Sequence, residues 1–374
     1  MLLASAINKL LMTHRFSIFT LASLLLLVCV GTSAKKRTFN EAKAIAQRQA
    51  TSLGATLSSA SIETAKRLNA SPAKGESRAY YVFPHDKGMG FTIVSGDDLL
   101  PEIVGYSDRG TYDATQLPDG YKMFLELYSD MVDGLAQGQP SAVQTASQAQ
   151  RRSQAKAARP VVAPLLGDRM WNQYAPFNNL CPKDGTKQTV TGCVATALAQ
   201  VFAYWRFPEA LMADIPAYTT HTKRLSVPAI EKGEPYDWDR MLDIYEEGYY
   251  SQEEADAVAK LMLHCGAALQ MDYTSSGSGA NIFLAKLTKY FGYDAETMQE
   301  VERDNYSLED WMNLLDAELQ AKRPVMYSGN SSTVGHQFVC DGSDGDGLYH
   351  INWGWGGYQD GYFDISLLNP DKGG

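Results

Sequence analysis

The chain has 374 residues, more than one average domain needs, so two or more folded units are expected. Hydrophobic residues make up 45% and charged residues 20%, an ordinary globular composition that argues against disorder throughout the chain. The formal net charge of −10 argues against a protein that binds nucleic acid through a basic surface.

The first 34 residues have the pattern of a secretory signal peptide. Two basic residues precede an apolar run over 19–30, and small residues occupy 31–34. We therefore expect cleavage near Ala34 and a protein that is secreted, periplasmic or held at the cell surface. A membrane anchor is the alternative, but the run is shorter than a bilayer span requires, so no stable membrane insertion is expected. Lipidation at Cys29 is disfavoured because the residue before it is too large.

Residues 35–137 are expected to form a small α+β domain ahead of the larger one. Helical spacing over 39–53, with Asn40 as N-cap, and over 119–137 flanks three strand patterns. Those patterns cover residues 79–83, 90–95 and 102–106.

Residues 138–159 differ in composition from both flanking regions. They contain no aromatic residue and one valine, so they are predicted to bury too little surface to offset the entropy of ordering. We interpret the segment as an exposed linker with maturation sites. The accessible cleavage points would be Arg151, Arg152, Lys156 and Arg159. A plain interdomain tether is the alternative.

Residues 160–374 are expected to form the larger domain, which holds all six tryptophans. Helical patterns come first and strand patterns later, which predicts a two-lobed α+β enzyme with a cleft between its lobes. The predicted helices are 193–206, 251–271, 280–291 and 307–321, and the predicted strands are 324–328, 337–341, 348–353 and 361–365.

Cys193 is the candidate nucleophile. Gly192 permits a tight turn before it, and an amphipathic helix begins at the cysteine. A helix N-terminus favours negative charge and so lowers the pKa of a thiol. A small buried cysteine is the alternative. The cysteines form no CxxC pair, which argues against a zinc ribbon or a thioredoxin motif, and no cofactor or metal is expected.

A cysteine nucleophile needs a base, and His336 is the best candidate. It follows a glycine-containing polar loop over 329–335 and begins a predicted strand. It lies 143 residues after Cys193, within the separation of about 130–150 typical of papain-type enzymes. His264, in an apolar helix, and His350, in a strand, are interpreted as packing residues.

The remaining candidates would orient the base and stabilise an oxyanion. Asn352 and Trp353 stand in an Asn-Trp-Gly-Trp-Gly-Gly segment, where they would orient His336, although a core and turn role is the alternative. Gln188 and the Cys193 N–H are the candidate oxyanion donors. Papain-type enzymes place this glutamine six residues before the cysteine, where this chain has Lys187.

Several segments together resemble the streptopain family of bacterial cysteine peptidases, within the papain-like superfamily, and its interpain-like members. They are TGCVATALAQ from residue 191, GHQFVCDG from 335, YHINWGWGG from 349, and YYVF and GFTIVSGDD in the prodomain. The resemblance implies a papain-like fold and a prodomain that keeps the enzyme inactive with its histidine displaced. It also implies that Ser278 and Gly335 contact substrate and that the P2 residue is hydrophobic. Relatives continue into a final strand where this chain stops at Gly374, so a truncated or processed chain is expected.

The predicted function is that of a secreted cysteine endopeptidase made as an inactive zymogen. It would hydrolyse protein or peptide substrates through a thioester, with its own prodomain as intramolecular inhibitor. Maturation is predicted to create a new terminus between Ala142 and Val161. The alternatives are Cys–His chemistry on a cell-wall amide, transglutaminase-type acyl transfer, and a non-catalytic binding module on a peptidase scaffold.

Overall fold

The computed structural model describes residues 35–70, 78–155, 159–330 and 335–367. The predicted signal peptide, Cys29, Lys156, residues 331–334 of the loop before His336 and the terminus at Gly374 lie outside these ranges. Among the described residues, no helix is both long enough and apolar enough to cross a membrane.

The helices agree with the sequence patterns except for two that were not predicted, α2 and α4. The helix α1 is capped by Thr38, which forms a reciprocal capping box with Glu41, so the prediction of Asn40 as N-cap is wrong by two residues. The helices are α1 (Phe39–Ser52), α2 (Ser59–Leu68), α3 (Asp119–Ala136), α4 (Pro140–Ala155), α5 (Cys193–Trp205), α6 (Gln252–Ala268), α7 (Leu284–Phe291) and α8 (Leu308–Gln320). Short 3-10 helices lie at Asp86–Gly88, Trp238–Arg240, Arg303–Asn305 and Ile365–Leu367.

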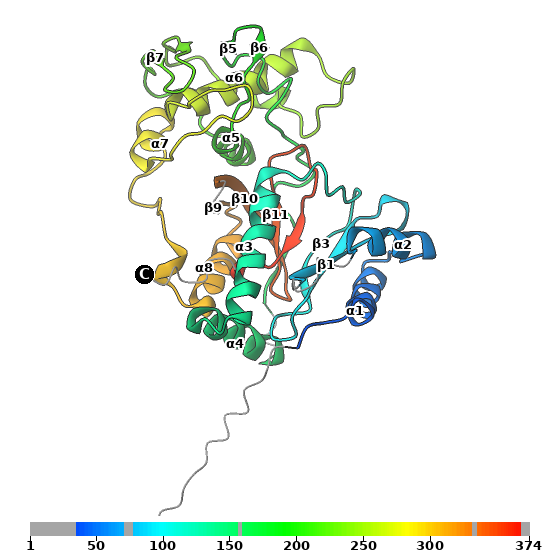
Figure 1. Ribbon diagram of the computed structural model, residues 1–374. Coiled ribbons are helices and arrows are strands. Elements are labelled where there is room, and N and C mark those ends of the chain that lie inside the picture. The colour runs from blue at the N-terminus through cyan, green and yellow to red at the C-terminus, as the bar shows by residue number, and fades with distance from the viewer. Residues whose placement is uncertain (1–34, 71–77, 156–158, 331–334, 368–374) are drawn as a thin grey trace, which may run out of the picture. The chain divides into compact units, whose positions relative to one another are not determined.

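Most strands belong to one antiparallel, eight-stranded sheet in the order β1-β2-β3-β12-β11-β10-β4, with β9 paired to β10 (Figure 1). Two hairpins, β5-β6 and β7-β8, stand apart from it. The strands are β1 (Tyr80–Pro84), β2 (Phe91–Ser95), β3 (Ile103–Ser107), β4 (Val161–Val162), β5 (Lys183–Asp184), β6 (Lys187–Gln188), β7 (Tyr218–Thr219), β8 (Ser226–Val227), β9 (Val325–Asn330), β10 (Gly335–Asp344), β11 (Tyr349–Asn352) and β12 (Gly361–Phe363).

The junction between β3 and β12 joins the predicted prodomain to the C-terminal strands. Tyr106 pairs with Tyr362 and Gly105 with Phe363 across it. A Cβ at Gly361 would come within 2.3 Å of the Tyr106 carbonyl oxygen, so β3 and β12 can approach closely only because this residue is glycine. The prodomain thus extends the sheet of the later residues.

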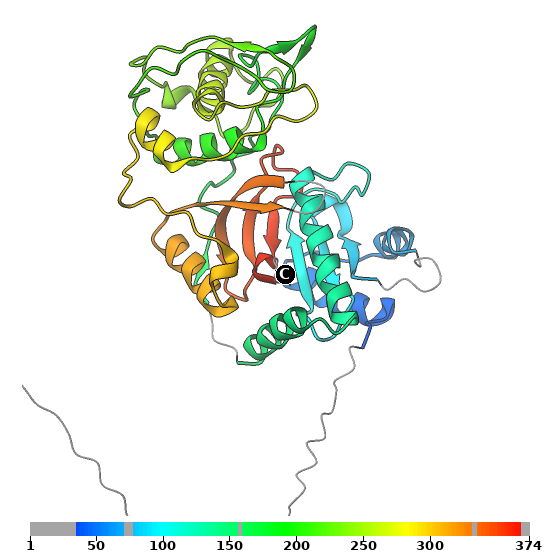
Figure 2. The same ribbon diagram turned by 60° about the vertical axis from the view of Figure 1, so that its left-hand side comes forward.

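Two large hydrophobic cores, beside two smaller clusters, lie in the described part of the chain. The sheet core includes side chains from β1–β3, α3 and α4 of the N-terminal part and from α8 and β10–β12. The helical core is built only from later residues, on α5, α6, α7 and the loops around them. Figure 2 shows α5, α6 and α7 gathered together, and α5 packs Ala197 and Val201 against Val339 of β10.

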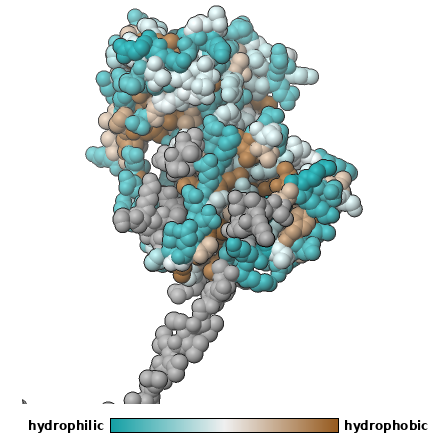
Figure 3. All heavy atoms as spheres, viewed as in Figure 1, coloured by the Kyte–Doolittle hydropathy of each residue, from teal (hydrophilic) through white to brown (hydrophobic). Residues whose placement is uncertain are grey.

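The helix α3 is amphipathic and covers β9 and β10. Its buried face carries Tyr121, Phe124 and Tyr128, each fully buried in the sheet core. Its outward face is hydrophilic, teal along the vertical helix at the centre of Figure 3. The hydrophobic effect on one helix face therefore holds the prodomain against the C-terminal strands.

The interpretation of 138–159 as an unstructured exposed linker is wrong, because Pro140–Ala155 form α4. Ala142, Ala146 and Ala149 lie at helical spacing and are buried in the sheet core. Alanine loses little entropy on entering a helix, so small side chains suffice where a count of large apolar residues predicts none.

Arg159 is also not an accessible cleavage point. Its side chain is 9% exposed, and the guanidinium pairs with Asp316 and, at 3.5 Å, with Glu309. Its main-chain N–H donates to Gly345 at 3.1 Å. The side chains of Arg151 and Arg152 lie outside the described part of the structure, so the predicted maturation sites there stay a prediction.

Candidate active site

Cys193 is the first residue of α5 and is partly exposed. Gly192 before it has φ +87°, and a Cβ there would lie 2.7 Å from the Ser278 carbonyl oxygen and 2.9 Å from the Met271 sulfur. Only glycine accommodates both the backbone angle and the close approach. The tight turn places the thiol at the helix N-terminus, as the sequence predicted.

The surroundings of Cys193 favour its thiolate. Burial raises the pKa of the thiol, but a hydrogen bond with His336 and the charge of that imidazole lower it. Main-chain N–H groups of Gln337 and Val194 hydrogen-bond the sulfur as well, and the net result is a pKa below the usual value. The helix N-terminus and the base thus act in the same direction.

His336 is buried near the start of β10. Its Nε2 donates to the main-chain carbonyl of Trp353 at 3.0 Å, which leaves Nδ1 for Cys193. Burial lowers the pKa of the imidazole, but the hydrogen bond and charge of Cys193, followed by the Trp353 carbonyl and Asp119, raise it above its usual value. A lowered thiol pKa beside a raised imidazole pKa favours a thiolate–imidazolium pair.

Of the two predicted orienting residues, only Trp353 reaches the imidazole, and it does so through its backbone. The Asn352 side chain donates from Nδ2 to Arg169 O at 2.9 Å and accepts the Gly354 N–H at 3.0 Å. The structure therefore does not bring the Asn352 amide to His336. Trp353 itself is buried, and its ring packs on Phe338 at 4.9 Å between centroids.

Gln188 is not aimed at the nucleophile. Its Nε2 donates to the carbonyls of Asn178 at 2.9 Å and Cys181 at 2.5 Å, so its donors are used within its own loop. Gln173 lies on a segment that pairs with the residues before the nucleophile, because its main-chain carbonyl accepts the Thr191 N–H at 3.2 Å. Its buried side chain has no hydrogen bond within the described residues. The sequence analysis did not weigh Gln173, because it sought the oxyanion donor at a fixed offset from the cysteine.

Ser278 and Gly335, the residues expected to contact substrate, flank the pair. The Ser278 carbonyl lies against Gly192, and its hydroxyl donates to Val190 O at 2.7 Å. Gly335 is exposed and directly precedes His336 in β10. The structure thus brings both residues beside the catalytic candidates.

The prodomain covers the histidine side of the site. A Cβ at Gly120, in the first turn of α3, would lie 2.1 Å from Cδ2 of His336, so only glycine lets the helix come this close. Tyr121 and Phe124 pack on Trp353 with ring centroids 5.8 and 6.3 Å away. His336 nonetheless contacts Cys193, so the expected displaced histidine is not observed in this structure.

The other cysteines and the histidines His264 and His350 are packed inside the protein. Cys181, Cys265 and Cys340 are free and buried. His264 contacts the Tyr236 hydroxyl at 2.9 Å, and His350 pairs with Asp341 at 2.6 Å. Among the described residues, no group of three or more His, Cys, Asp or Glu side chains is placed to hold a metal ion.

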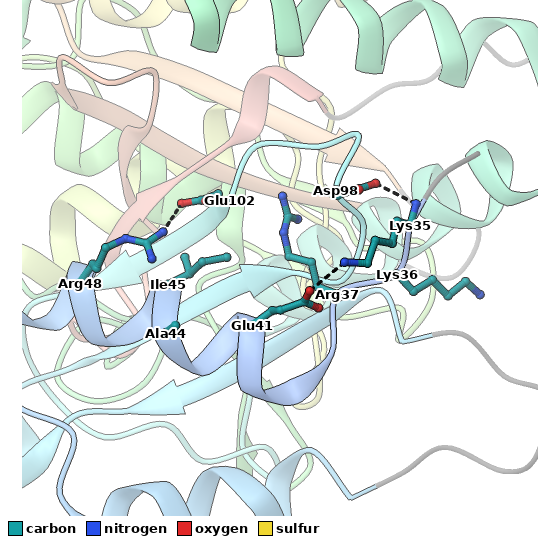
Figure 4. A pocket seen from close by; sticks show the side chains of 9 residues that line it. All are labelled: Lys35, Lys36, Arg37, Glu41, Ala44, Ile45, Arg48, Asp98 and Glu102. Atoms are coloured by element: carbon teal, nitrogen blue, oxygen red, sulfur yellow. Dashed lines mark hydrogen bonds and ion pairs between the residues drawn. The ribbon is translucent and has the colours of Figure 1, made fainter. Parts of the chain in front are cut away.

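A hollow beside α1 is separate from these residues (Figure 4). Its charged side chains pair with one another, Lys35 with Glu41 at 2.9 Å and Arg48 with Glu102 at 2.7 Å. Both pairs are solvent-exposed, so they contribute little to stability. The hollow carries no nucleophile or histidine.

Residues 171–363 match the peptidase C10 family, and residues 34–132 match the Spi protease inhibitor family. The chain is 35% identical over 311 residues to streptopain of Streptococcus pyogenes, covering 78% of this chain and 74% of that protein. It is 30% identical over 362 residues to the thiol protease/hemagglutinin PrtT of Porphyromonas gingivalis. That alignment covers 94% of this chain but only 41% of the relative's length.

Two solved structures from Prevotella intermedia are also similar. Prointerpain A matches with a TM-score of 0.64 and 32% identity, covering 79% of this chain and 92% of that one. Active interpain A matches with a TM-score of 0.51 and 39% identity, covering 56% and 88%. The predicted resemblance and the predicted α+β, papain-like fold behind a prodomain are therefore confirmed.

Proposed function

The chain belongs to the peptidase C10 family as a cysteine peptidase preceded by an inhibitor-like prodomain, and from this premise we propose that Cys193 is its nucleophile and His336 its general base and acid. The observation that supports this assignment is the hydrogen bond between the two side chains, with the imidazole held from behind by the Trp353 carbonyl. A base that contacts the nucleophile and is itself oriented by a third group is the arrangement that activates a thiol.

In the proposed mechanism, the Cys193 thiolate attacks the carbonyl carbon of a peptide bond. The oxyanion accepts hydrogen bonds from the Cys193 N–H and from the amide of Gln173. Gln188 is not used in this role, because its Nε2 already donates to carbonyls of its own loop. The His336 imidazolium gives its proton to the leaving amine, and a thioester forms. His336 then takes a proton from water, whose oxygen attacks the thioester and releases the acid and the free cysteine.

The prodomain blocks this chemistry by occupying the histidine side of the cleft. Asp119 and Gly120 at the start of α3 lie where a substrate would have to approach the imidazole. Catalysis therefore begins only after α3 leaves the sheet. Because the pair is already in contact beneath it, we expect removal of the prodomain, rather than a rearrangement of the dyad, to release activity.

Export and substrate preference belong to the same proposal. The N-terminal pattern supports secretion to the periplasm, the cell surface or the medium. A hydrophobic P2 residue belongs to the proposal on the family resemblance alone, because Met271 beside Gly192 is fully buried. The substrates would be proteins or peptides.

A Cys193→Ala variant tests the proposal, with Cys265→Ala as control because that cysteine is fully buried in the helical core. We expect Cys193→Ala to fold, to lose at least about 10³-fold in peptide hydrolysis, and to keep its prodomain. The control should hydrolyse peptides and should show a new N-terminus between Ala142 and Val161. Undiminished hydrolysis by Cys193→Ala would rule out the assignment.

A further inference from the structure

The end of the loop after β11 folds back onto Trp353. Three hydrogen bonds fix Trp353, two from that loop and one from His336. The Trp353 N–H donates to Oδ1 of Asp360 at 2.9 Å, and the indole Nε1 donates to Gln359 O at 3.1 Å. The third bond is at the carbonyl, which accepts Nε2 of His336 at 3.0 Å. The end of the loop, residues 359–360, therefore fixes its beginning.

A second side chain acts on the same carbonyl through a peptide bond. The peptide unit between Trp353 and Gly354 presents its carbonyl to His336 and its N–H to Oδ1 of Asn352 at 3.0 Å. Asn352 is anchored in turn, because its Nδ2 donates to Arg169 O at 2.9 Å. One peptide plane is thus held between Asn352 and His336.

The backbone of this loop needs such anchors. Gly354, Gly356 and Gly357 have φ angles of +73°, +67° and +77°, and Gln359 has +64°. Glycines lose more conformational entropy on ordering than other residues, so a loop with several of them does not by itself hold a carbonyl in one direction. Buried hydrogen bonds at both ends supply the restraint.

In the precursor the prodomain also holds the loop. The Ser107 hydroxyl donates to Asp360 O at 2.7 Å, and Nε2 of Gln359 donates to Thr111 O at 3.1 Å. These two bonds are lost when the prodomain leaves. In the mature enzyme, the bonds from Asp360 and Asn352 remain.

We propose that Asp360 and Asn352 are positioning residues of the peptidase, which fix the peptide planes on either side of Trp353 so that its carbonyl orients His336 toward Cys193. The inference rests on the proposed role of His336 as the base. Neither side chain touches substrate, and each acts only through the Trp353 main chain.

The chemistry of Asp360 indicates which replacement should preserve its role. Asp360 is 7% exposed, and burial raises the pKa of its carboxyl to about 7. The Oδ1 atom accepts the Trp353 N–H whether the group is a carboxylate or a neutral acid. Asn at this position therefore keeps the acceptor, whereas Ala removes it.

The test compares Asp360→Ala, Asp360→Asn and Asn352→Ala, each matured from the full chain, on a fluorogenic peptide. Asp364→Ala is the matched control, because Asp364 is a similarly buried carboxyl directly after β12 and bonds Ser366 rather than Trp353. We expect Asp360→Ala and Asn352→Ala to lose about 10- to 100-fold in kcat with KM within about twofold of wild type. The acid limb of kcat/KM should move to higher pH, because a poorly placed imidazolium stabilises the thiolate less. Asp360→Asn and Asp364→Ala should stay within about threefold of wild type.

Asn352→Ala carries the test by itself if Asp360→Ala does not yield folded protein. Wild-type kcat in the folded Ala variants would overturn the inference, and so would equal losses in Asp360→Asn or in the Asp364→Ala control. A His336→Ala variant distinguishes a failure of the proposed base from a failure of the positioning roles of Asp360 and Asn352. If His336→Ala keeps wild-type turnover, the proposed function fails. If it is inactive while Asp360→Ala and Asn352→Ala are not slowed, only the positioning role fails.

Discussion

The sheet core and the helical core differ in where their residues come from. The sheet core joins prodomain side chains on α3 and β1–β3 to C-terminal strands, whereas the helical core draws only on later residues around α5–α7. The catalytic candidates divide between the two, with Cys193 on α5 and His336 on β10. Removing the prodomain therefore strips the half that carries the base and leaves the half that carries the nucleophile intact.

The largest expected effect compares one buried phenylalanine from each core. Phe124 packs on Phe363 at 5.2 Å in the sheet core, and Phe291 packs on Phe202 at 4.7 Å in the helical core. Replacement of either by Ala should cost about 3–5 kcal/mol in the free energy of unfolding, measured in urea. Only Phe124→Ala should speed the release of the prodomain, followed on gels. Equal acceleration of prodomain release in both variants would contradict the conclusion that only the sheet core holds the prodomain.

The next effect concerns a carboxyl buried in the sheet core. Burial raises the pKa of Asp364 to about 7, so its neutral form is favoured in the folded state. Its contribution to stability is fully present below about pH 4 and is lost as pH rises to about 7. Asp364→Asn should remove this loss, on the order of 4 kcal/mol at pH 8, while changing stability little at pH 4. Thermal unfolding across pH measures it, and a gain of equal size at both pH values would contradict the assignment.

The helical core should respond to pH in the opposite direction. Burial, together with Lys260, lowers the pKa of His264 to about 4, so the folded state favours its neutral form. Stability is therefore lost as pH falls from about 6.5 toward 4. His264→Gln, which still offers a partner to the Tyr236 hydroxyl, should reduce this acid loss by about 2 kcal/mol. An unchanged acid limb of thermal stability would show that another group is responsible.

The smallest expected effect concerns the close contact between Gly120 of α3 and His336. Gly120→Ala would place a Cβ 2.1 Å from His336, and we expect it to weaken prodomain docking by about 1–3 kcal/mol and to speed maturation. Gly134→Ala in the same helix is the control, since its Cβ would meet mainly the mobile end of Gln139 at 2.8 Å. The control should mature at the wild-type rate or more slowly, because Ala favours the helix. Identical maturation rates in the two variants would refute the close contact.

The sequence predicted what local patterns encode. The helices at 39–53, 119–137 and 193–206 and the strand after His336 follow from periodicity, and Cys193 and His336 follow from a turn, a helix start and a spacing. The helix α4 was missed because its burial rests on small alanines.

Long-range contacts set the limit of that prediction. The β3–β12 junction depends on segments far apart in the chain. The Gln188 amide is engaged by main-chain carbonyls of its own loop, which side-chain periodicity does not place. The role of the Trp353 carbonyl and the bond from Asp360 have the same origin, since backbone direction inside a glycine-containing loop has no side-chain pattern.

The most direct test of the central claim is the pH dependence of Cys193 alkylation in the full-length precursor, followed by mass spectrometry of its peptide, beside His336→Ala. A thiolate–imidazolium pair already in contact beneath the prodomain predicts a half-maximal rate below the usual thiol value of about 8.5, and a shift to higher pH in His336→Ala. Coincident curves for the two proteins, both near or above the usual value, would contradict the account.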